Sequence, residues 1–402
     1  MRWLEDYRDI VGDETIHTIY KKARKLYGKH MVHINSTYQG GGVAEMLVCL
    51  VPLLNDTGIN AGWRILHGNN DFFEITKKFH NGLQGEKINV SEIKKRLYVQ
   101  TNVDFSVYTH IDHDFVVIHD PQPLPIIKFY DKRQPWAWRC HIDLSHPDQE
   151  LWKFLSKFIL KYDVVIISNE KYKKADLPVE QRIIYPAINP LSPKNMVINN
   201  GTIQKFLKKF NVPVDKPLIT QISRFDKWKD PLGVIEVFKK VKRKIDCRLI
   251  LCGSMATDDP EGFTIFEDVQ HAAGDLIESG EIIIITAENN ILVNILQKIS
   301  SVIIQKSIRE GFGLTVSEAL WKETPVIASN VGGIPLQIED GVTGFLCEPD
   351  DEDGFAERAI EIIKSPELGK ELARKGKELI RNNFLTTRLL LDYIDLMNDI
   401  MN

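Results

Sequence analysis

The stretch SVIIQKSIREGFGLTVSEAL, residues 301–320, predicts a buried strand, a glycine-containing loop and a helix in succession. Its apolar start does not alternate with polar residues, which is typical of a strand buried on both faces. Gly311 and Gly313 follow, and from Leu314 onward the apolar side chains fit helical spacing. Buried strands of this kind pair in parallel and are joined by helices, so the stretch favours an α/β fold.

The same pattern recurs along the chain, with helical stretches between the apolar runs. The further runs are MVHIN at 31, FVVIH at 115, VVIIS at 164, LITQIS at 218, CRLILCG at 247, EIIIIT at 281 and PVIAS at 325. Prolines and polar residues in YPAINPLSPKN, residues 185–195, interrupt the pattern. We therefore expect two doubly wound domains, 1–190 and 191–380, with a final helix over 381–402, and ligands in the cleft where the strands of both domains end.

The composition predicts a soluble protein of the cytoplasm. Hydrophobic residues make up 43% of the chain and charged residues 26%, and no apolar run approaches the ~20 residues that cross a bilayer. Residues 1–28 carry acids and an amphipathic pattern, whereas a signal peptide needs a basic start and an unbroken apolar stretch. A net charge of −4 argues against nucleic acid as the main partner.

The five cysteines form no CxxC pair, which favours reduced, buried thiols over a metal or disulfide site. Cys247 and Cys252 lie at an odd separation in an expected strand, so their side chains should point to opposite faces. Both observations fit a cytoplasmic protein.

Two cations follow the expected strand at 218. Arg224 lies at the end of the strand and Lys229 precedes Asp230 and Pro231, a typical N-cap and first-turn pair of a helix. Two cations and free helix N–H groups can converge on an anion such as a diphosphate. The alternative is that both are surface cations, paired with Asp226 and Asp230.

Two glycine loops precede expected helices. Gly311 and Gly313 allow backbone amides to approach a ligand, and Glu318, one turn into the helix, can accept hydrogen bonds from neighbouring hydroxyls of a sugar or ribose. An ordinary turn with a solvated glutamate is the alternative. In TYQGGGVAEML, residues 37–47, the amides of Gly40 to Gly42 could contact phosphate or sugar, although the run is also typical of a tight strand-to-helix connection.

The N-terminal half contains a group of histidines and acids around the expected strand at 115. His110, Asp112 and His113 precede this strand, whereas His119 and Asp120 follow it. A metal site is disfavoured because no HExxH motif or cysteine partner accompanies them. Sugar recognition by the polar residues is favoured instead, with Trp136 or Trp138 as a candidate for an apolar sugar face, although core packing is the favoured interpretation of both tryptophans.

Taken together, these stretches resemble the retaining glycosyltransferases of family 4. The carrying motifs are an E-x7-E pair formed by Glu310 and Glu318, SRFDKWKDP at 223, GGV at 41 and GGIPLQIEDGVTGFL at 332. The resemblance implies the GT-B fold, with two Rossmann-like domains facing a cleft and a C-terminal helix that crosses back to the first. It also implies a donor site for a nucleotide sugar, made by Gly41, Gly42, Arg224, Lys229, Glu310, Gly311, Phe312, Gly313, Leu314, Thr315 and Glu318.

In that family Glu310 and the following amides would hold the donor sugar, Glu318 would hold the ribose, and Arg224 with Lys229 would neutralise the diphosphate. The segments HDPQPLP at 119 and WRCHIDLS at 138 resemble the trehalose glycosyltransferring synthases. This implies reversible transfer of glucose from a nucleotide diphosphate glucose to free glucose, giving α,α-trehalose. The acceptor set would be His119, Asp120, Arg139 and His141, and the catalytic set would be Arg224, Lys229, Glu310, Asp120 and His141.

Retention would follow if the acceptor hydroxyl and the leaving phosphate share one face of the sugar, because Glu310 and Glu318 belong to one loop and helix and cannot flank the bond. No metal is required if cations supply the charge, and Mg²⁺ would at most stimulate. Asp258 and Asp259 belong to an expected loop, and DED at 351 begins an expected helix, so neither forms a DxD motif at a strand end.

Several alternatives remain open at this point. A trehalose phosphorylase of the same fold would use phosphate in place of the nucleotide, and another family 4 transferase would use a different acceptor. Trehalose-phosphate synthase and a catalytically silent sensor are less favoured, and a nicotinamide dehydrogenase lacks its GxGxxG fingerprint. The N-terminal helix is a candidate interface of a homodimer.

Overall fold

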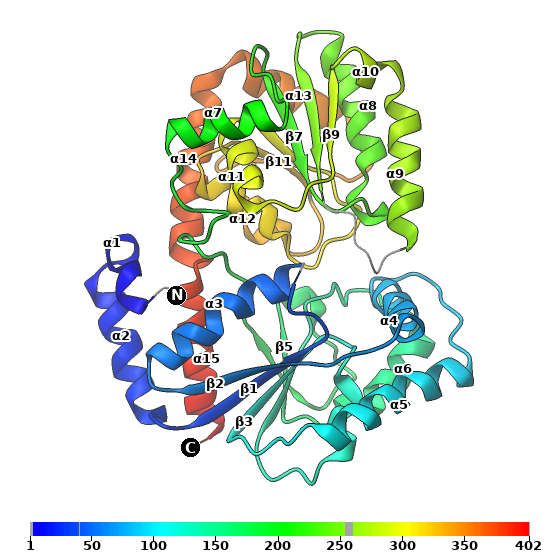
Figure 1. The fold of residues 1–402 in the computed structure, drawn as a ribbon, viewed down its shortest axis with the longest axis vertical. Helices are drawn as coiled ribbons and strands as arrows, with labels where there is room; N and C mark the ends of the chain where they lie inside the picture. Colours follow the sequence, from blue (N-terminus) through cyan, green and yellow to red (C-terminus); the bar gives the residue numbers. More distant parts are fainter. Residues whose placement is uncertain (1–2, 40, 254–259, 402) are drawn as a thin grey trace. The chain divides into compact units, whose positions relative to one another are not determined.

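The computed structural model describes residues 3–39, 41–253 and 260–401. The chain divides into two compact units, shown in Figure 1. The N-terminal unit comprises Met1–Ala187 and Leu385–Asn402, and the C-terminal unit comprises Ile188–Phe384. The chain thus passes from the first unit to the second inside the proline-rich stretch 185–195, and its last helix returns to the first unit.

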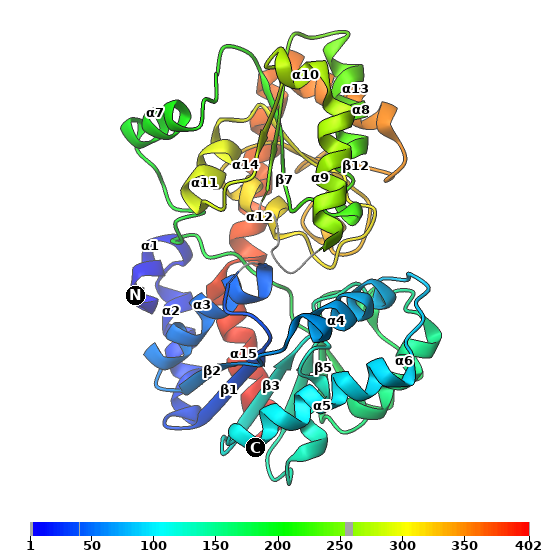
Figure 2. The same cartoon turned by 45° about the vertical axis from the view of Figure 1, so that its right-hand side comes forward.

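The N-terminal unit is built on a six-stranded sheet in the order β2-β1-β3-β4-β5-β6, and all neighbouring strands are parallel. Its strands are β1 (His30–Asn35), β2 (Asn60–Ile65), β3 (Phe115–His119), β4 (Trp136–Arg139), β5 (Val164–Ile167) and β6 (Glu180–Ile183). Its helices are α1 (Arg8–Val11), α2 (Asp13–Ala23), α3 (Gly42–Asp56), α4 (Asn70–Leu83), α5 (Glu92–Tyr108), α6 (Gln149–Ile159) and α15 (Thr386–Ile400). Figure 2 shows α4, α5 and α6 on one side of this sheet and α2, α3 and α15 on the other.

The C-terminal unit repeats this plan with a parallel six-stranded sheet in the order β12-β11-β10-β7-β8-β9. Its strands are β7 (Leu218–Ile222), β8 (Arg248–Cys252), β9 (Ile282–Ile285), β10 (Val302–Gln305), β11 (Val326–Ser329) and β12 (Phe345–Cys347). Its helices are α7 (Asn200–Lys209), α8 (Pro231–Lys242), α9 (Pro260–Ala273), α10 (Asp275–Glu278), α11 (Asn290–Ile299), α12 (Leu314–Trp321), α13 (Glu352–Lys364) and α14 (Pro366–Asn383). In Figures 1 and 2, α8, α9 and α13 lie on one side of the sheet, and α7, α11, α12 and α14 lie on the other.

Each sheet has a position where the strand order reverses. In the N-terminal unit this switch point lies between β1 and β3, and in the C-terminal unit it lies between β7 and β10. Open α/β sheets bind ligands beyond the carboxyl ends of the strands at this position, because the two flanking loops diverge there. The loops after β1 and β3 carry Gly41 and Asp120, and the loops after β7 and β10 carry Arg224 and Glu310.

The predicted α/β architecture with doubly wound sheets is confirmed, and each apolar run quoted above forms a strand. The strands β2, β4, β6 and β12 were not predicted from the sequence. The outer strands β2 and β6 are half-exposed along their lengths, so their residues do not form an apolar run. The strand β12 is only three residues long, and β4 was interpreted as ligand-binding sequence.

The last helix completes the N-terminal unit. Helix α15 contacts α2 and α3, and Leu389, Leu390 and Tyr393 on it are fully or almost fully buried. The return to this unit starts at Leu385, a few residues after the expected position 381. Among residues 3–39, 41–253 and 260–401, no helix is long and apolar enough to span a membrane.

Four of the cysteines are buried free thiols, as expected, whereas Cys49 is only half-buried and corrects that expectation. Cys49 lies on α3, whose outward side is partly exposed. Cys247 and Cys252 pack in two different apolar clusters on opposite faces of the C-terminal sheet. This confirms the prediction from their odd separation, since successive side chains of a strand alternate between faces.

Candidate active site

A left-handed glycine shapes the loop at the N-terminus of α12. Gly313 is the N-cap residue with φ +84°, and a β-carbon on it would lie 3.2 Å from Cγ of Glu310. Only glycine adopts this conformation without strain, so the loop folds back over the Glu310 side chain. The structure thus confirms a helix that starts at Leu314, and the residues Gly313 to Thr315 of its first turn are half-buried.

The Glu310 carboxylate is buried, and polar groups from β10 and its loop surround it. The Ser307 hydroxyl donates to Glu310 Oε2 at 3.2 Å, the Gln305 amide approaches the same oxygen at 3.5 Å, and Lys229 forms an ion pair with it. A buried carboxylate remains charged only where donors and a cation compensate for the lost water. Ser307 and Gln305 were not predicted as site residues, since single polar residues after a strand give no distinct signal.

The Lys229 ion pair decides between two interpretations of the SRFDKWKDP stretch. Asp226 instead caps a short 3-10 helix (Lys227–Lys229) by accepting from the amide of Trp228 at 2.8 Å. Asp230 caps α8 by accepting from the amide of Gly233 at 3.0 Å, as predicted, and forms an ion pair with Lys306. Both aspartates therefore have other partners, and Lys229 belongs to the Glu310 cluster.

Arg224 is exposed at the end of β7. The β7 and β8 ends approach closely there, because a β-carbon on Gly253 would lie 1.7 Å from the carbonyl oxygen of Ser223. Among the residues that the structure describes, no hydrogen bond or ion pair engages the Arg224 side chain. Its guanidinium is thus available to an anion, and it lies on the same loop after β7 as Lys229, at the switch point of the sheet.

Glu318 is buried on α12 and not solvated. Its Oε2 accepts from the Gln297 amide at 3.2 Å, and its Oε1 lies 3.5 Å from Lys194 Nζ. The neighbouring Lys322 is also buried, and burial lowers the pKa of its ammonium to about 7, although the Glu318 charge opposes this shift. The alternative of a solvated glutamate in an ordinary turn is therefore wrong, whereas a ribose contact by Glu318 stays a prediction.

The segment GGIPLQ, residues 332–337, packs against the glycine loop at Gly311–Gly313. A β-carbon on Gly333 would lie 2.8 Å from Cα of Phe312, and the Gln337 amide donates to the Phe312 carbonyl oxygen at 2.5 Å. The Phe312 side chain is buried against Phe384, with ring centroids 5.5 Å apart. Gly311 is buried beside it. This packing explains why a second glycine pair follows the first in the sequence.

In the N-terminal unit, the loop after β1 leads directly into α3. Gly41 is the N-cap residue with φ +80°, and Gly42 is the first residue of the helix. Gly40 lies outside the described residues. Asn35 at the end of β1 accepts from Trp63 Nε1 at 2.7 Å and donates to the carbonyl oxygen of Thr37 at 2.6 Å, so side-chain hydrogen bonds hold the start of the loop.

Asp120 occupies a strained position directly after β3. Its φ is +61°, its amide donates to the carbonyl oxygen of Arg139 at 2.8 Å, and its Oδ1 accepts from the amide of His141 at 2.8 Å. Burial raises the pKa of the Asp120 carboxyl to about 7, although the His141 hydrogen bond and the Arg139 charge oppose this. Strained, non-glycine backbone next to a carboxyl with a raised pKa is typical of functional positions.

Three imidazoles form a hydrogen-bonded row across the carboxyl ends of β1, β3 and β4. His33 Nδ1 lies 2.9 Å from His119 Nε2, and His119 Nδ1 lies 3.0 Å from His141 Nε2. His119 and His141 are stacked, with ring centroids 5.3 Å apart. Burial lowers the pKa of His33 to about 3 and the pKa values of His119 and His141 well below their usual range, so all are neutral at pH 7. His33 was not predicted, since its position inside an apolar strand gave no functional signal.

Arg139, expected to bind the acceptor, is almost fully buried. Its guanidinium donates to the Tyr393 hydroxyl and to the Ile184 carbonyl oxygen, both at 3.2 Å, and packs over the Tyr393 ring. This placement ties β4 to α15 and corrects the expectation that Arg139 contacts a sugar. The expectation was wrong because residues of β4 alternate in direction, and the sequence did not reveal β4 as a strand.

The tryptophans likewise belong to the core. Trp136 and Trp138 are fully buried on β4, and Trp138 Nε1 donates to the Asp120 carbonyl oxygen at 3.0 Å. Core packing, the favoured interpretation of both tryptophans, is therefore confirmed, and neither ring is exposed to a sugar. Trp138 nevertheless supports the site, because its hydrogen bond holds the strained Asp120 backbone.

His110, Asp112 and His113 precede β3 and so lie at the end of the sheet opposite His119. Among the described residues no group of three or more His, Cys, Asp and Glu side chains is placed to hold a metal ion. Asp258 and Asp259 lie outside the described residues. Asp351 caps α13 by accepting from the amide of Gly354 at 2.8 Å, so the DED segment begins a helix, as predicted.

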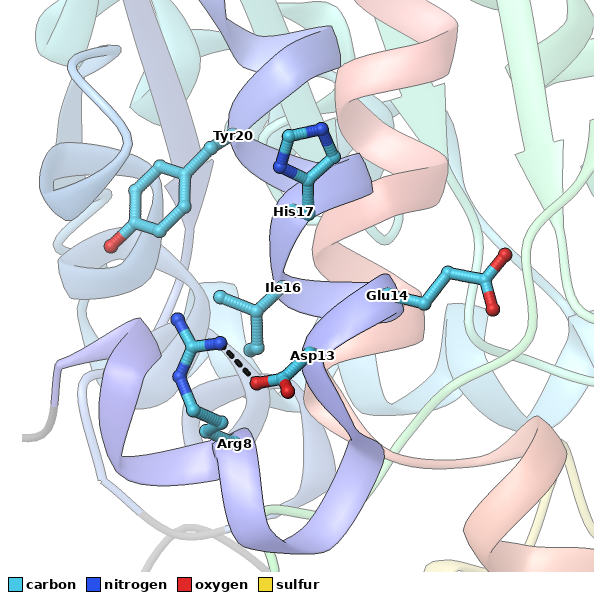
Figure 3. Close-up of a pocket in the computed structure, with 6 residues that line it drawn as sticks. All are labelled: Arg8, Asp13, Glu14, Ile16, His17 and Tyr20. Carbon is cyan, nitrogen blue, oxygen red and sulfur yellow. Dashed lines mark hydrogen bonds and ion pairs between the residues drawn. The ribbon is translucent and has the colours of Figure 1, made fainter.

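A shallow hollow on the N-terminal helices is not part of this constellation. Figure 3 shows its lining residues, Arg8, Asp13, Glu14, Ile16, His17 and Tyr20, on and next to α2. Arg8 forms an ion pair with Asp13 across it. None of these residues comes from a loop at the carboxyl end of a strand, and none carries the predicted chemistry.

The chain matches known proteins over nearly its whole length. Residues 33–174 match the family described as "Trehalose synthase, N-terminal domain", and residues 202–379 match the family described as "Glycosyl transferases group 1". The chain is 47% identical over 404 residues to trehalose synthase of Thermococcus litoralis, covering 98% of this chain and 96% of that one. The chain belongs to the trehalose synthase family. Membership assigns it to trehalose metabolism as a glycosyltransferase.

This member of the trehalose synthase family is also similar to more distant enzymes in sequence and in fold. Trehalose phosphorylase of Pleurotus pulmonarius is 29% identical over 92% of this chain and 57% of the phosphorylase. The solved structure of a UDP-forming α,α-trehalose-phosphate synthase from Burkholderia xenovorans, in complex with glucose-6-phosphate, superposes with a TM-score of 0.76 at 12% identity, over 93% of this chain and 100% of that one. The fold is therefore GT-B, as the resemblance implied.

Proposed function

We propose that this member of the trehalose synthase family is a retaining glycosyltransferase that moves glucose reversibly from a nucleotide diphosphate glucose to free glucose, forming α,α-trehalose. The observation that carries the proposal is the cluster at the switch point of the C-terminal sheet. There the Lys229–Glu310 ion pair lies just before the N-terminus of α12, and the exposed Arg224 belongs to the same loop after β7 as Lys229. Two cations and a helix N-terminus suit a diphosphate, and a carboxylate suits sugar hydroxyls.

The chemistry assigned to these residues is charge stabilisation. The bond from the anomeric carbon to the diphosphate oxygen breaks, the acceptor hydroxyl oxygen forms the new bond, and the hydroxyl proton passes to the departing diphosphate. Arg224 and Lys229 stabilise the negative charge that develops on the leaving group. Because Glu310 and Glu318 belong to one loop and helix, they do not supply an acid and a nucleophile on opposite faces, and a same-face transfer is proposed instead.

On the acceptor side, Asp120 and His141 are the groups proposed to bind glucose, with His119 behind them. Support comes from their shared position beyond β3 and β4 and from the hydrogen bond between the His141 amide and Asp120 Oδ1 at 2.8 Å. Gly41 and Gly42 are proposed to contact the donor through their amides. Activity without added metal, a cytoplasmic location and a homodimer remain predictions.

Trehalose phosphorylase activity is the second candidate. A specific observation favours it: the Glu318 carboxylate already has Gln297 and Lys194 as partners, so it can be retained for structure without binding a ribose. In that case inorganic phosphate would occupy the cation site of Arg224 and Lys229.

Product analysis separates the candidates. The purified protein is incubated with glucose and UDP-, ADP- or GDP-glucose, or with glucose 1-phosphate, each with and without EDTA. Trehalose from a nucleotide donor supports the proposal and identifies the base. Trehalose from glucose 1-phosphate alone supports the phosphorylase, and donor turnover without trehalose indicates another acceptor and refutes the proposed product.

A further inference from the structure

The row of three imidazoles can exist in only two neutral arrangements. A neutral imidazole carries one N–H, so His119 donates in one of its two hydrogen bonds and accepts in the other. If His119 Nδ1 donates to His141, then His33 Nδ1 donates to His119, and the remaining N–H of the row is on His141 Nδ1. In the opposite arrangement His141 Nδ1 is bare, and the remaining N–H is on His33 Nε2.

The environment of His33 distinguishes the two arrangements. His33 Nε2 is buried and has no hydrogen-bond partner among the described residues. The Tyr393 ring packs edge-on against His33, with centroids 5.4 Å apart, and supplies no acceptor for an N–H at this end of the row. An N–H buried on His33 Nε2 would stay unpaired, whereas an N–H on the half-buried His141 can be reached by a ligand or water. The bare form of His33 Nε2 is therefore favoured, and the N–H is displaced to His141.

At the other end of the row, His141 Nδ1 and Asp120 Oδ2 have no hydrogen-bond partner in the part of the chain that the structure describes. His141 and Asp120 are both half-buried and are joined by the bond from the His141 amide to Asp120 Oδ1. The row thus ends at His141 with Nδ1–H as a donor, and the adjoining Asp120 offers Oδ2 as an acceptor. Such a pair matches a sugar hydroxyl group or two neighbouring ones.

We propose that His33 and His119 are positioning residues that fix His141 as its Nδ1–H tautomer, so that His141 donates a hydrogen bond to an oxygen of the acceptor sugar and does not act as a base. The inference rests on the proposed function for the identity of the sugar. The tautomer itself is a property of the free protein. An experiment that finds the other His141 tautomer can therefore be distinguished from one that finds no trehalose formation.

The first test is ¹⁵N NMR of histidine-labelled full-length protein without substrate, with signals assigned by their loss in His141→Asn. The expected result is a protonated Nδ1 and a bare Nε2 on His141. A bare Nδ1 on His141 overturns the proposal. This measurement needs no activity, so it stands even if the protein makes no trehalose.

Two variants of His33 test the direction of control. Asn places an N–H donor near the position of His33 Nδ1, whereas Leu removes the donor. We expect His33→Asn to retain the His141 tautomer, and His33→Leu to give a mixture with about tenfold lower kcat/KM for glucose, the loss of about one hydrogen bond. An unchanged single tautomer in a folded His33→Leu protein contradicts the role of His33.

Fluorinated acceptors test the contact itself. Fluorine in place of a hydroxyl can accept a weak hydrogen bond but cannot donate one, whereas a deoxy sugar can do neither. At one ring position we expect deoxyfluoroglucose to be a better acceptor than the deoxyglucose, and we expect this ratio to approach one in His141→Phe. Equal activity of the two sugars at every position refutes a donor role for His141. The ratio does not depend on the fraction of folded enzyme.

Discussion

Lys229 has one described anionic partner, and that partner is the predicted donor carboxylate. The ion pair with Glu310 orients both groups before any ligand binds, while Ser307 and Gln305 retain hydrogen bonds to the same oxygen. If the lysine charge is lost, the Glu310 carboxylate remains buried but still accepts hydrogen bonds from Ser307 and Gln305. This is why catalysis should depend on Lys229 more strongly than stability does.

We predict that Lys229→Ala lowers kcat by about 100-fold, because one charge that stabilises the leaving group is lost. The melting temperature should also fall by a few degrees, because the buried Glu310 carboxylate loses its cation, but the hydrogen bonds from Ser307 and Gln305 limit this loss. The matched control is Lys227→Ala, since Lys227 lies on the same 3-10 turn and packs over Trp228. Steady-state kinetics and thermal unfolding of both variants give the answer. Near wild-type turnover in Lys229→Ala contradicts the diphosphate assignment.

Asp120 should give the reaction a pH dependence close to neutrality. Its pKa is raised to about 7, so below this pH it carries a proton and cannot accept from a hydroxyl as a carboxylate. We expect kcat/KM for glucose to rise with pH through about 7. In Asp120→Asn this limb should disappear and activity should fall about tenfold or more. Asn tolerates the positive φ and retains the oxygen that accepts from His141. If kcat/KM of Asp120→Asn still rises with pH through about 7, the titrating group is not Asp120.

At the scale of single elements, the start of α12 depends on a conformation as much as on a side chain. Gly313 and Gly341 both have positive φ, +84° and +71°. A β-carbon on Gly313 meets Glu310 and Ile334, whereas a β-carbon on Gly341 has no atom within 4 Å. The two glycines therefore share the backbone strain of a substitution and differ in its effect on the site.

We expect Gly313→Ala and Gly341→Ala each to lower the free energy of unfolding by about 1–2 kcal/mol, the cost of left-handed backbone for a residue with a β-carbon. Only Gly313→Ala should also reduce kcat/KM, because its methyl group displaces the Glu310 side chain. Denaturant unfolding and kinetics of both proteins measure the two effects. Equal activities in the two variants would show that the loop adapts without loss.

At the scale of the whole molecule, the last helix, α15, packs into the core of the N-terminal unit. Leu390 on α15 is fully buried in the N-terminal unit, whereas Asp395 on the same helix is partly exposed and pairs with Lys22 at 2.8 Å. We expect Leu390→Ala to cost about 2–5 kcal/mol and Asp395→Ala at most about 1 kcal/mol. Urea unfolding of the full-length protein measures both. Similar small losses would mean that α15 contributes little to the stability of this unit.

The fold class and the glycine loop before α12, where the donor site is predicted, could be read from local patterns in the sequence. Buried parallel strands read as apolar runs, and glycines before a helix predict a loop that a ligand can approach, because both signals are local in the chain. The Asp230 cap, the helix at Leu314 and the opposite directions of Cys247 and Cys252 followed in the same way. Half-exposed edge strands such as β2 and β6 escaped detection, since their residues give no such pattern.

The contacts of the polar residues, in contrast, could be seen only in the folded protein. The side chains of Arg139 and Trp138 are buried, and His33 contacts His119. Lys229 forms its ion pair with Glu310 and not with the aspartates beside it in the sequence. These partners lie on different strands, in the loops and turns that follow them, or on the returning helix α15. The sheet order that brings them together is set by packing of the whole core, and no spacing within the sequence encodes it.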